Sequence, residues 1–273
     1  MKESMSLALL TAGSITHSPV SRFPEIVKLI GPVKAPTYRE ASRAVNALKG
    51  GLAVRSVADI PAATLFFVCA PRRRVPHLVR DMVDAVADWR GRDVVLCSDS
   101  LDSRDLDTLA RRGAHTASVL PLDWFDKPHF LVEGDPRAVQ RTRKMLESTR
   151  GRVLEIETRG TPFYTAAADL ASLILLPLLE AATASLRDAG IPHPLAHKMV
   201  DRMVARSLRN FGKSGSKTWR PPTAHTTHAR LDRQLEDARG HNNRLSDYYR
   251  DSLDAAVRYM AASREPLKRA ANA

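Results

Sequence analysis

Short apolar runs recur through the first 157 residues of the chain and alternate with amphipathic stretches. Such runs, bounded by turn residues, are typical of buried strands. They predict strands at residues 7–11, 31–35, 65–70, 93–97, 116–120, 129–133 and 152–157. Because strands that alternate with helices form parallel sheets covered on both faces, the pattern predicts an α/β fold with a mainly parallel, doubly wound sheet.

Three of the stretches between these runs have the spacing of amphipathic helices. The first, residues 76–89, places four apolar side chains on one face: Leu78, Met82, Val83 and Val86. The others cover residues 104–113 and 136–151, and each ends at a glycine, as helices commonly do.

The strand pattern stops after Glu157, and the rest of the chain has helical periodicity. Residues 161–190 predict one long helix with Thr161 as its N-cap, Gly190 at its end and a kink at Pro177. We therefore predict a sheet domain over residues 1–157 and an all-helical domain over residues 158–273. The apolar length of the long helix predicts a homodimer formed through the helical domain. A further apolar stripe suits either a core or a subunit interface: Leu195, Met199, Met203 and Phe211.

The chain has 273 residues and a formal net charge of +12. Its length accommodates one large domain or two modest ones. The basic residues are spread along the whole chain, so the charge favours a solvated surface or a phosphate-bearing cofactor over nucleic acid. The two cysteines, Cys69 and Cys97, lie in apolar runs and are expected to be buried thiols. The spacing of cysteines and histidines indicates no metal site.

No segment is expected to enter a membrane. The apolar run near the N-terminus is too short for a signal peptide, and the longest apolar block, residues 170–179, lies between Asp169 and Glu180. We therefore expect a cytoplasmic protein.

The first predicted strand leads into a turn that could hold a dinucleotide. In the stretch LALLTAGSITHSPV, the pattern G-x-G-x-x-G keeps only its middle glycine, Gly13, with Thr11 and Thr16 in the outer places. The middle glycine lets the backbone approach a pyrophosphate. Gly13, Ser14 and Ile15 are therefore predicted to bind a cofactor. The alternative is a strand-to-loop turn in which Gly13 is incidental.

The end of the second predicted strand bears on which dinucleotide binds. NAD enzymes usually carry Asp or Glu there for the ribose 2′-hydroxyl, whereas NADP enzymes carry arginine nearby. The segment VKAPTYREASRAVN has no acid at the strand end and contains Thr37, Arg39 and Arg43, so NADP is expected rather than NAD. Arg39 and Arg43 are four residues apart, and a solvated helix face is the alternative. Ala70 and Pro71, at the end of the third predicted strand, are further candidate cofactor contacts.

Seven motifs run through most of the chain in a characteristic order and spacing: LLTAGSI, TYREASRAVNAL, VCAPRR, DVVLCSDSLDS, LPLDWF, FLVEGD and PFYTAAADLASLILLPLLEAA. In this combination the chain resembles a family of Rossmann-like oxidoreductases whose helical C-terminal domain is of unknown function, relatives of the 6-phosphogluconate dehydrogenase and ketopantoate reductase superfamily. The resemblance implies a Rossmann-like N-terminal domain, a helical C-terminal domain, and reduction of a small carbonyl or imine substrate with NAD(P)H.

The chain departs from the family pattern where the resemblance would place histidines. CSDS at 97–100 replaces His-x-Ser-Gly, LP at 120–121 replaces His-Pro, and YTAA at 164–167 replaces Tyr-His-Ala-Ala. Cofactor binding is compatible with these changes, but the family's own proton donor is missing.

Reduction of a carbonyl or imine needs a hydride from the nicotinamide and a proton donor beside the reacting atom. The chemically able residues in segments expected to border an interdomain cleft are Tyr164, Asp99, Lys217, His225 and His228, of which the first four are the predicted catalytic residues. In the loop that contains Asp99, Asp102 or Ser103 is expected to cap the following helix.

The sequence therefore predicts an NADPH-dependent reductase of a small oxo acid or imine. The polar loop rich in lysine, arginine and histidine at residues 213–228 favours this activity. The alternative is a catalytically degenerate dinucleotide-binding protein that acts as a sensor or interaction partner, which the missing histidines and glycines favour.

Overall fold

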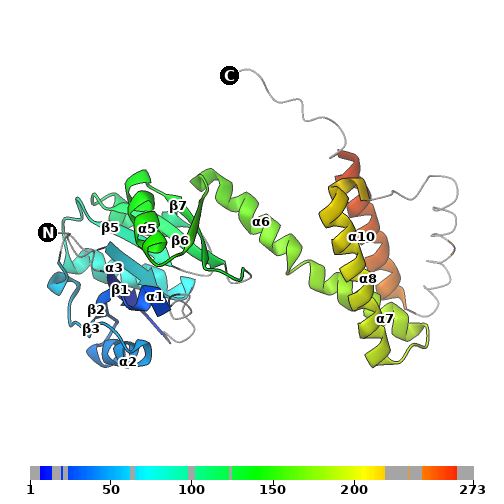
Figure 1. Cartoon of the computed structure of the whole chain (residues 1–273), viewed down its shortest axis with the longest axis horizontal. Coiled ribbons are helices and arrows are strands. Elements are labelled where there is room, and N and C mark those ends of the chain that lie inside the picture. The colour runs from blue at the N-terminus through cyan, green and yellow to red at the C-terminus, as the bar shows by residue number, and fades with distance from the viewer. Residues whose placement is uncertain are drawn as a thin grey trace, which may run out of the picture. The chain divides into compact units, whose positions relative to one another are not determined.

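The computed structural model describes residues 7–13, 20, 24–61, 65–97, 102–122, 125–218, 233 and 242–262. The chain divides into two compact units, Met1–Ala167 and Ala168–Ala273. The first unit contains the sheet and the second is helical, and each is described by itself (Figure 1). The predicted domain boundary near residue 158 stays a prediction.

One eight-stranded sheet forms the centre of the first unit, in the order β3-β2-β1-β4-β5-β6-β7-β8. Its strands are β1 (Leu7–Thr11), β2 (Ile30–Lys34), β3 (Leu52–Ala53), β4 (Leu65–Cys69), β5 (Asp93–Cys97), β6 (His115–Leu122), β7 (His129–Gly134) and β8 (Arg152–Glu155). Neighbouring strands from β3 to β6 are parallel, β7 runs antiparallel to β6, and β8 is parallel to β7. The order of the first six strands is that of doubly wound, dinucleotide-binding sheets, so the predicted fold class is confirmed.

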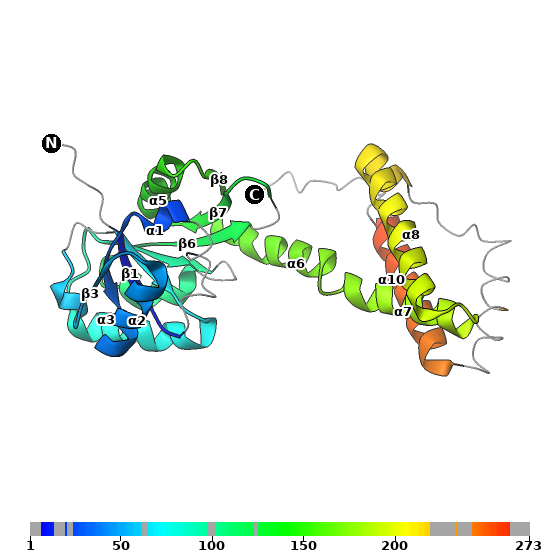
Figure 2. The ribbon, with the colours of Figure 1, turned by 60° about the horizontal axis from the view of Figure 1, so that its bottom comes forward.

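Helices cover both faces of this sheet (Figure 2). Residues of α1 (Pro24–Val27), α2 (Tyr38–Leu48) and α5 (Pro136–Ser148) join one apolar cluster with Leu7 and Leu9 of β1. Residues of α3 (Val75–Ala85) and α4 (Asp107–Ala110) join a second cluster with Ala8 and Leu10. Because β1 is buried on both faces, it appears in the sequence as a continuous apolar run and not as an alternating one.

Most of the predicted elements of this unit are confirmed, with shifts of a few residues at their ends. The short edge strand β3 was not predicted, because it has two residues and its Leu52 is 70% exposed. The helix predicted over residues 76–89 ends at Ala85, so Val86 lies beyond it. The other three residues of the predicted face, Leu78, Met82 and Val83, are buried.

The described residues after β8 form the helices α6 (Thr161–Ala171), α7 (Leu175–Asp188), α8 (His193–Ser214) and α10 (Asn243–Ala262). The single helix predicted over residues 161–190 is therefore two helices. Pro177 has no amide hydrogen, and its ring would clash with the carbonyl of Leu173 in a regular helix, so the break falls at residues 172–174. Thr161 is the first residue of α6 and not its N-cap, because a 3₁₀ turn over Thr158–Gly160 leads directly into the helix.

Many apolar side chains of these helices are exposed. On α8 the buried residues are Ala196 and Val200, whereas Leu195, Met203 and Phe211 of the predicted stripe are at least 50% exposed and are not part of a core within the chain. The helical segment Thr158–Asp188 is long and apolar enough to cross a membrane, and none of its most apolar window is buried. Residues 170–179, the longest apolar block of the sequence, are only a part of this segment. One such helix is weak evidence for a membrane span.

Candidate functional site

The carboxyl ends of β1, β4 and β5 lie side by side and carry Thr11, Cys69 and Cys97. Thr11 pairs with Cys69, and the register of β4 with β5 puts Cys97 next to Cys69. All three residues are 2% exposed, and neither cysteine is in a disulfide. The buried Thr11 hydroxyl has no hydrogen-bond partner among the described residues. Because native proteins rarely leave a buried hydroxyl unsatisfied, this edge of the sheet fits a ligand with a polar group.

The backbone at Gly13 has the conformation that the turn after β1 requires. Its φ of +97° lies in the left-handed region, which residues with a Cβ rarely adopt. A Cβ built there would have as its nearest contact Cδ of Pro71, 4.0 Å away. The structure thus brings Gly13 together with Pro71, and the backbone of Gly13 can be approached closely. Ser14 and Ile15 lie outside the described residues.

The first two turns of α2, which follow the turn after β2, carry two arginines, Arg39 and Arg43, and one acid, Glu40. Thr37 is the N-cap of α2, and its backbone amide and hydroxyl both donate to the Glu40 carboxylate, at 3.0 and 2.9 Å. The hydrogen-bond donors of Thr37 are therefore both used by Glu40 of the same helix. Arg39 and Arg43 are exposed on α2, and the buried residue that follows β2 is Ala35, not an acid.

Arg72 links the loop after β4 to the segment after β5. Its guanidinium lies 3.2 Å from a carboxylate oxygen of Asp102 and 3.3 Å from one of Asp105. Arg104, which donates a hydrogen bond to Asp102, lowers the pKa of the Asp102 carboxyl, and Arg72 makes a smaller contribution in the same direction. Asp102 also accepts from the backbone amide of Arg104, which confirms the predicted helix cap.

A buried carboxylate holds the start of the helical segment after β5 by hydrogen bonds. Glu133 of β7 is 0% exposed, and its two oxygens accept from the backbone amide and the hydroxyl of Ser103, at 2.6 and 2.9 Å. On the neighbouring strand, the Ser118 hydroxyl accepts from the amide of Asp102 at 3.1 Å. The start of the helix after β5 is therefore anchored to β6 and β7. Glu133 was not predicted from the sequence as a site residue.

The predicted catalytic residues fall in different parts of the chain. Asp99 and His225 lie outside the described residues. Tyr164 of α6 is half-buried and packs against the apolar cluster of Leu120, Leu122 and Leu131 on β6 and β7.

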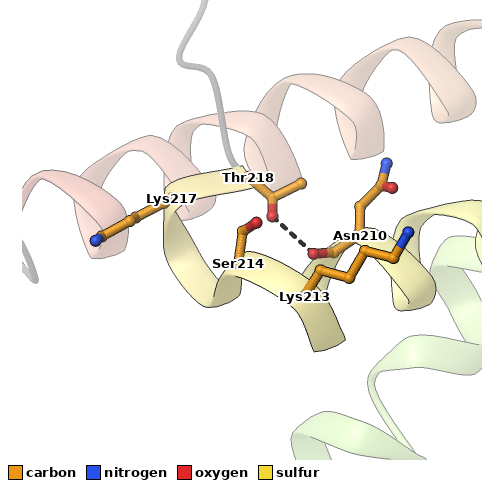
Figure 3. A pocket seen from close by; sticks show the side chains of 5 residues that line it. All are labelled: Asn210, Lys213, Ser214, Lys217 and Thr218. Atoms are coloured by element: carbon orange, nitrogen blue, oxygen red, sulfur yellow. Dashed lines mark hydrogen bonds between the residues drawn. The ribbon is translucent and has the colours of Figure 1, made fainter.

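Lys217 belongs to the helical unit, in the short 3₁₀ helix after α8, and borders an open cavity of about 370 Å³ (Figure 3). The other lining residues are Asn210, Lys213, Ser214 and Thr218. The Thr218 hydroxyl donates to the backbone carbonyl of Asn210 at 3.1 Å, and the side chains of Lys213 and Lys217 point in opposite directions. The two ammonium groups thus do not converge on one ligand position. The described residues contain no cluster of three or more histidine, cysteine, aspartate or glutamate residues that could hold a metal ion.

Residues 128–253 match the family model described as "Domain of unknown function (DUF2520)". This match covers less than half of the chain. No curated protein matches the chain. The resemblance drawn from the sequence, to Rossmann-like oxidoreductases with a helical C-terminal domain of unknown function, is confirmed.

Solved structures similar to the whole chain share its fold. Protein TM1727 from Thermotoga maritima is 19% identical, covers 93% of this chain and 98% of its own, and gives a TM-score of 0.63. The Aspergillus terreus reductive aminase, in complex with NADPH and ethyl levulinate, is 14% identical, with 93% and 94% coverage and a TM-score of 0.64. A Myxococcus stipitatus imine reductase variant, in complex with NAD+, is 16% identical, with 95% of each chain covered and a TM-score of 0.63. At these identities the likeness establishes the fold alone.

The DUF2520 match begins just before β7 and includes Glu133, Tyr164 and Lys217. The turn after β1, the β2–α2 turn and the loop after β4 precede the match. The candidate cofactor contacts and the DUF2520 domain are therefore separate parts of the chain, and both contribute strands to one sheet.

Proposed function

We propose that the chain is an NADPH-dependent oxidoreductase that reduces a small oxo acid or imine. The observation that carries this proposal is the open approach to Gly13 next to the unsatisfied hydroxyl of Thr11. Both lie at the edge of a doubly wound sheet, beside the switch point between β1 and β4 where such sheets bind dinucleotides. The complexes of the reductive aminase with NADPH and of the imine reductase with NAD+ support a nicotinamide cofactor.

The residues of this edge fit a dinucleotide. In the proposal, Gly13, Ser14 and Ile15 hold the pyrophosphate, and Ala70 and Pro71 border it from the end of β4. When bound, the nicotinamide supplies the hydride. NADP is proposed over NAD because Ala35 stands where an acid would hold the ribose 2′-hydroxyl, and because Thr37, Arg39 and Arg43 follow it.

Tyr164 is the proposed proton donor for the reduction. A phenol can donate a proton to a developing alkoxide or amine. Because the Tyr164 ring is half-buried against β6 and β7, few side-chain conformations are open to it. Asp99, Lys217 and His225 remain the other candidate acids. The substrate is proposed to be a small molecule, and the protein to act in the cytoplasm without nucleic acid.

Gly13→Ala is expected to weaken NADPH binding about tenfold or more, because a Cβ at this position would stand between the backbone and the pyrophosphate. Calorimetric titration of the purified wild-type and variant chains with NADPH and NADH measures this effect. Gly91→Ala is the matched control, since Gly91 also has a positive φ, +76°, and a Cβ built there meets nothing within 4 Å.

Binding of NADPH that Gly13→Ala weakens and Gly91→Ala does not would support the proposal. Absence of binding by either nucleotide would overturn it. Binding without turnover of any oxo acid or imine would favour the alternative, a dinucleotide-binding sensor.

A homodimer through the helical part of the chain is proposed as well. Leu173 is 65% exposed and Leu176, three residues further along the helical unit, is 64% exposed, which is unusual for large apolar side chains so close in the sequence of one monomer. A second copy of the chain would remove this surface from water.

Leu173→Lys is expected to shift the chain from dimer to monomer, because an ammonium group would be buried at the interface. The loss of one buried leucine, about 2 kcal/mol, alone raises the dissociation constant by more than tenfold. Size-exclusion chromatography with light scattering gives the mass directly. Leu52→Lys is the control, because Leu52 is 70% exposed on the edge strand of the other unit. A wild-type chain that is monomeric at every concentration would contradict the proposal.

A further inference from the structure

A further arginine, Arg55, from the segment after β3, lies beside the turn between β2 and α2. The guanidinium carbon of Arg55 is 4.6 Å from the centroid of the Tyr38 ring, within the range of a cation–π contact. Tyr38 is the first residue of α2 and is 46% exposed, and Arg55 is exposed as well. The contact therefore occurs at the surface, where both groups can meet a ligand.

The parallel register of β2 and β3 explains this position. Val33 pairs with Ala53, and the amide of Val54 donates to the carbonyl of Val33 at 3.0 Å. The chain that leaves β3 therefore reaches the same carboxyl edge of the sheet as the β2–α2 turn. Arg55 comes from the segment that follows the neighbouring strand, and no spacing pattern around Arg39 and Arg43 would reveal it.

The charge of Arg55 is not neutralised by an acid within the described part of the chain. The acids nearest to Tyr38 and Arg55 in sequence are Glu40 and Asp59, and each belongs to a capping box. Glu40 accepts from Thr37, and Asp59 accepts from the amide of Ser56 at 3.0 Å. By contrast, Arg72, Arg104 and Arg141 are ion-paired. A guanidinium that stacks on a ring keeps the donors along its edge available for an anion.

We infer that Arg55, held over Tyr38, selects NADPH by binding the phosphate on its adenosine ribose. This inference rests on the proposed function and extends it to a residue outside the β2–α2 segment. A phosphate dianion matches the planar fork of donors on a guanidinium, whereas the 2′-hydroxyl of NADH brings no charge to it. Because the stack on Tyr38 restricts the arginine before the ligand arrives, less side-chain entropy is lost on binding.

Arg55→Ala is expected to weaken NADPH binding by about 10- to 100-fold and to leave NADH binding within about twofold, since it removes charge-assisted hydrogen bonds made to the phosphate alone. Arg55→Lys keeps the charge but loses the planar fork, so its NADPH affinity falls between those of the wild type and Arg55→Ala. The measurement is calorimetric titration of the full-length chain with each nucleotide.

Tyr38 acts as a positioning residue and is tested through the same ratio of affinities. Tyr38→Ala is expected to lower NADPH affinity by about 2- to 5-fold without changing NADH affinity, and Tyr38→Phe, which retains the ring, to leave both unchanged. Arg90→Ala is the control for the loss of one exposed positive charge. Arg90 precedes β5 and so lies at the amino ends of the strands, whereas Arg55 lies at the carboxyl ends. Thermal unfolding of each variant establishes that it is folded.

The outcomes separate this inference from the proposed function. A wild type that prefers NADPH, together with an Arg55→Ala variant that has lost the preference, supports both. If the wild type binds NADPH and Arg55→Ala weakens both nucleotides equally or neither, the inference is overturned and the proposed function stands. If the wild type binds neither nucleotide, both are overturned.

Discussion

Replacing Arg141 with alanine is expected to lower the free energy of unfolding by about 3–5 kcal/mol, because it leaves a buried carboxylate without its partner. Asp93, the first residue of β5, is 0% exposed, and a guanidinium nitrogen of Arg141 on α5 lies 2.5 Å from its Oδ2. Nε of Arg137 is 3.6 Å from the other oxygen, beyond hydrogen-bond distance. Arg141 is therefore the main compensation for the charge of Asp93. Urea denaturation followed by circular dichroism measures the change.

The matched control for this experiment is Arg143→Ala on the same helix. Arg143 pairs with Glu155, and the side chains are 37% and 45% exposed, so the loss is expected to be at most about 1 kcal/mol. In an Asp93→Asn/Arg141→Ala double variant the buried charge is gone, and part of the stability should return. Equal losses for Arg141→Ala and Arg143→Ala would show that Asp93 does not depend on Arg141.

Gly134→Ala is expected to destabilise the chain by at least about 3 kcal/mol, which combines backbone strain with overpacking. Gly134, the last residue of β7, has a φ of +129°. A Cβ built there would lie 2.5 Å from the Thr116 carbonyl oxygen and 2.6 Å from Cα of Ala117, both part of the β6 backbone. Neither atom can move without distorting the strand, so the loss exceeds that of an ordinary glycine replacement.

Gly91→Ala separates these two contributions, because it imposes a positive φ on alanine in open space. Its cost is expected to be about 1 kcal/mol, the ordinary penalty for a Cβ in the left-handed region. Both variants are compared with the wild type by the midpoint of urea unfolding. A Gly134→Ala loss no larger than that of Gly91→Ala would mean that β6 and β7 can separate locally at little cost.

The sheet could be predicted from the sequence because its strands are buried on both faces. A run that is apolar throughout, such as Leu65–Cys69, indicates a strand that is covered on both faces. The edge strand β3 could not be predicted, since two partly solvated residues leave no pattern. The break within the 161–190 segment was predicted as a kink at Pro177, but its position, before the proline, depends on which carbonyl the proline ring would meet.

The candidate site was predictable only where local chain geometry determines it. Gly13 could be identified because a turn after β1 needs a residue that tolerates a positive φ. Glu133 and Arg55 could not be identified, because strand register determines what each side chain contacts. Glu133 on β7 contacts Ser103 in the segment after β5, and Arg55 in the segment after β3 contacts Tyr38 in the segment after β2. A single acid in the apolar run HFLVEG was the one available indication of Glu133.

The burial of the two cysteines has a practical consequence for labelling. Cys69 and Cys97 are the chain's complete set of thiols, and at 2% exposure each is shielded from bulky reagents while the sheet is intact. A cysteine introduced at Gly91, in open space, would therefore react with a maleimide dye well before either native thiol. The wild-type chain thus serves as its own low-background template for fluorescence, and uptake of dye by the native thiols reports that the sheet has opened.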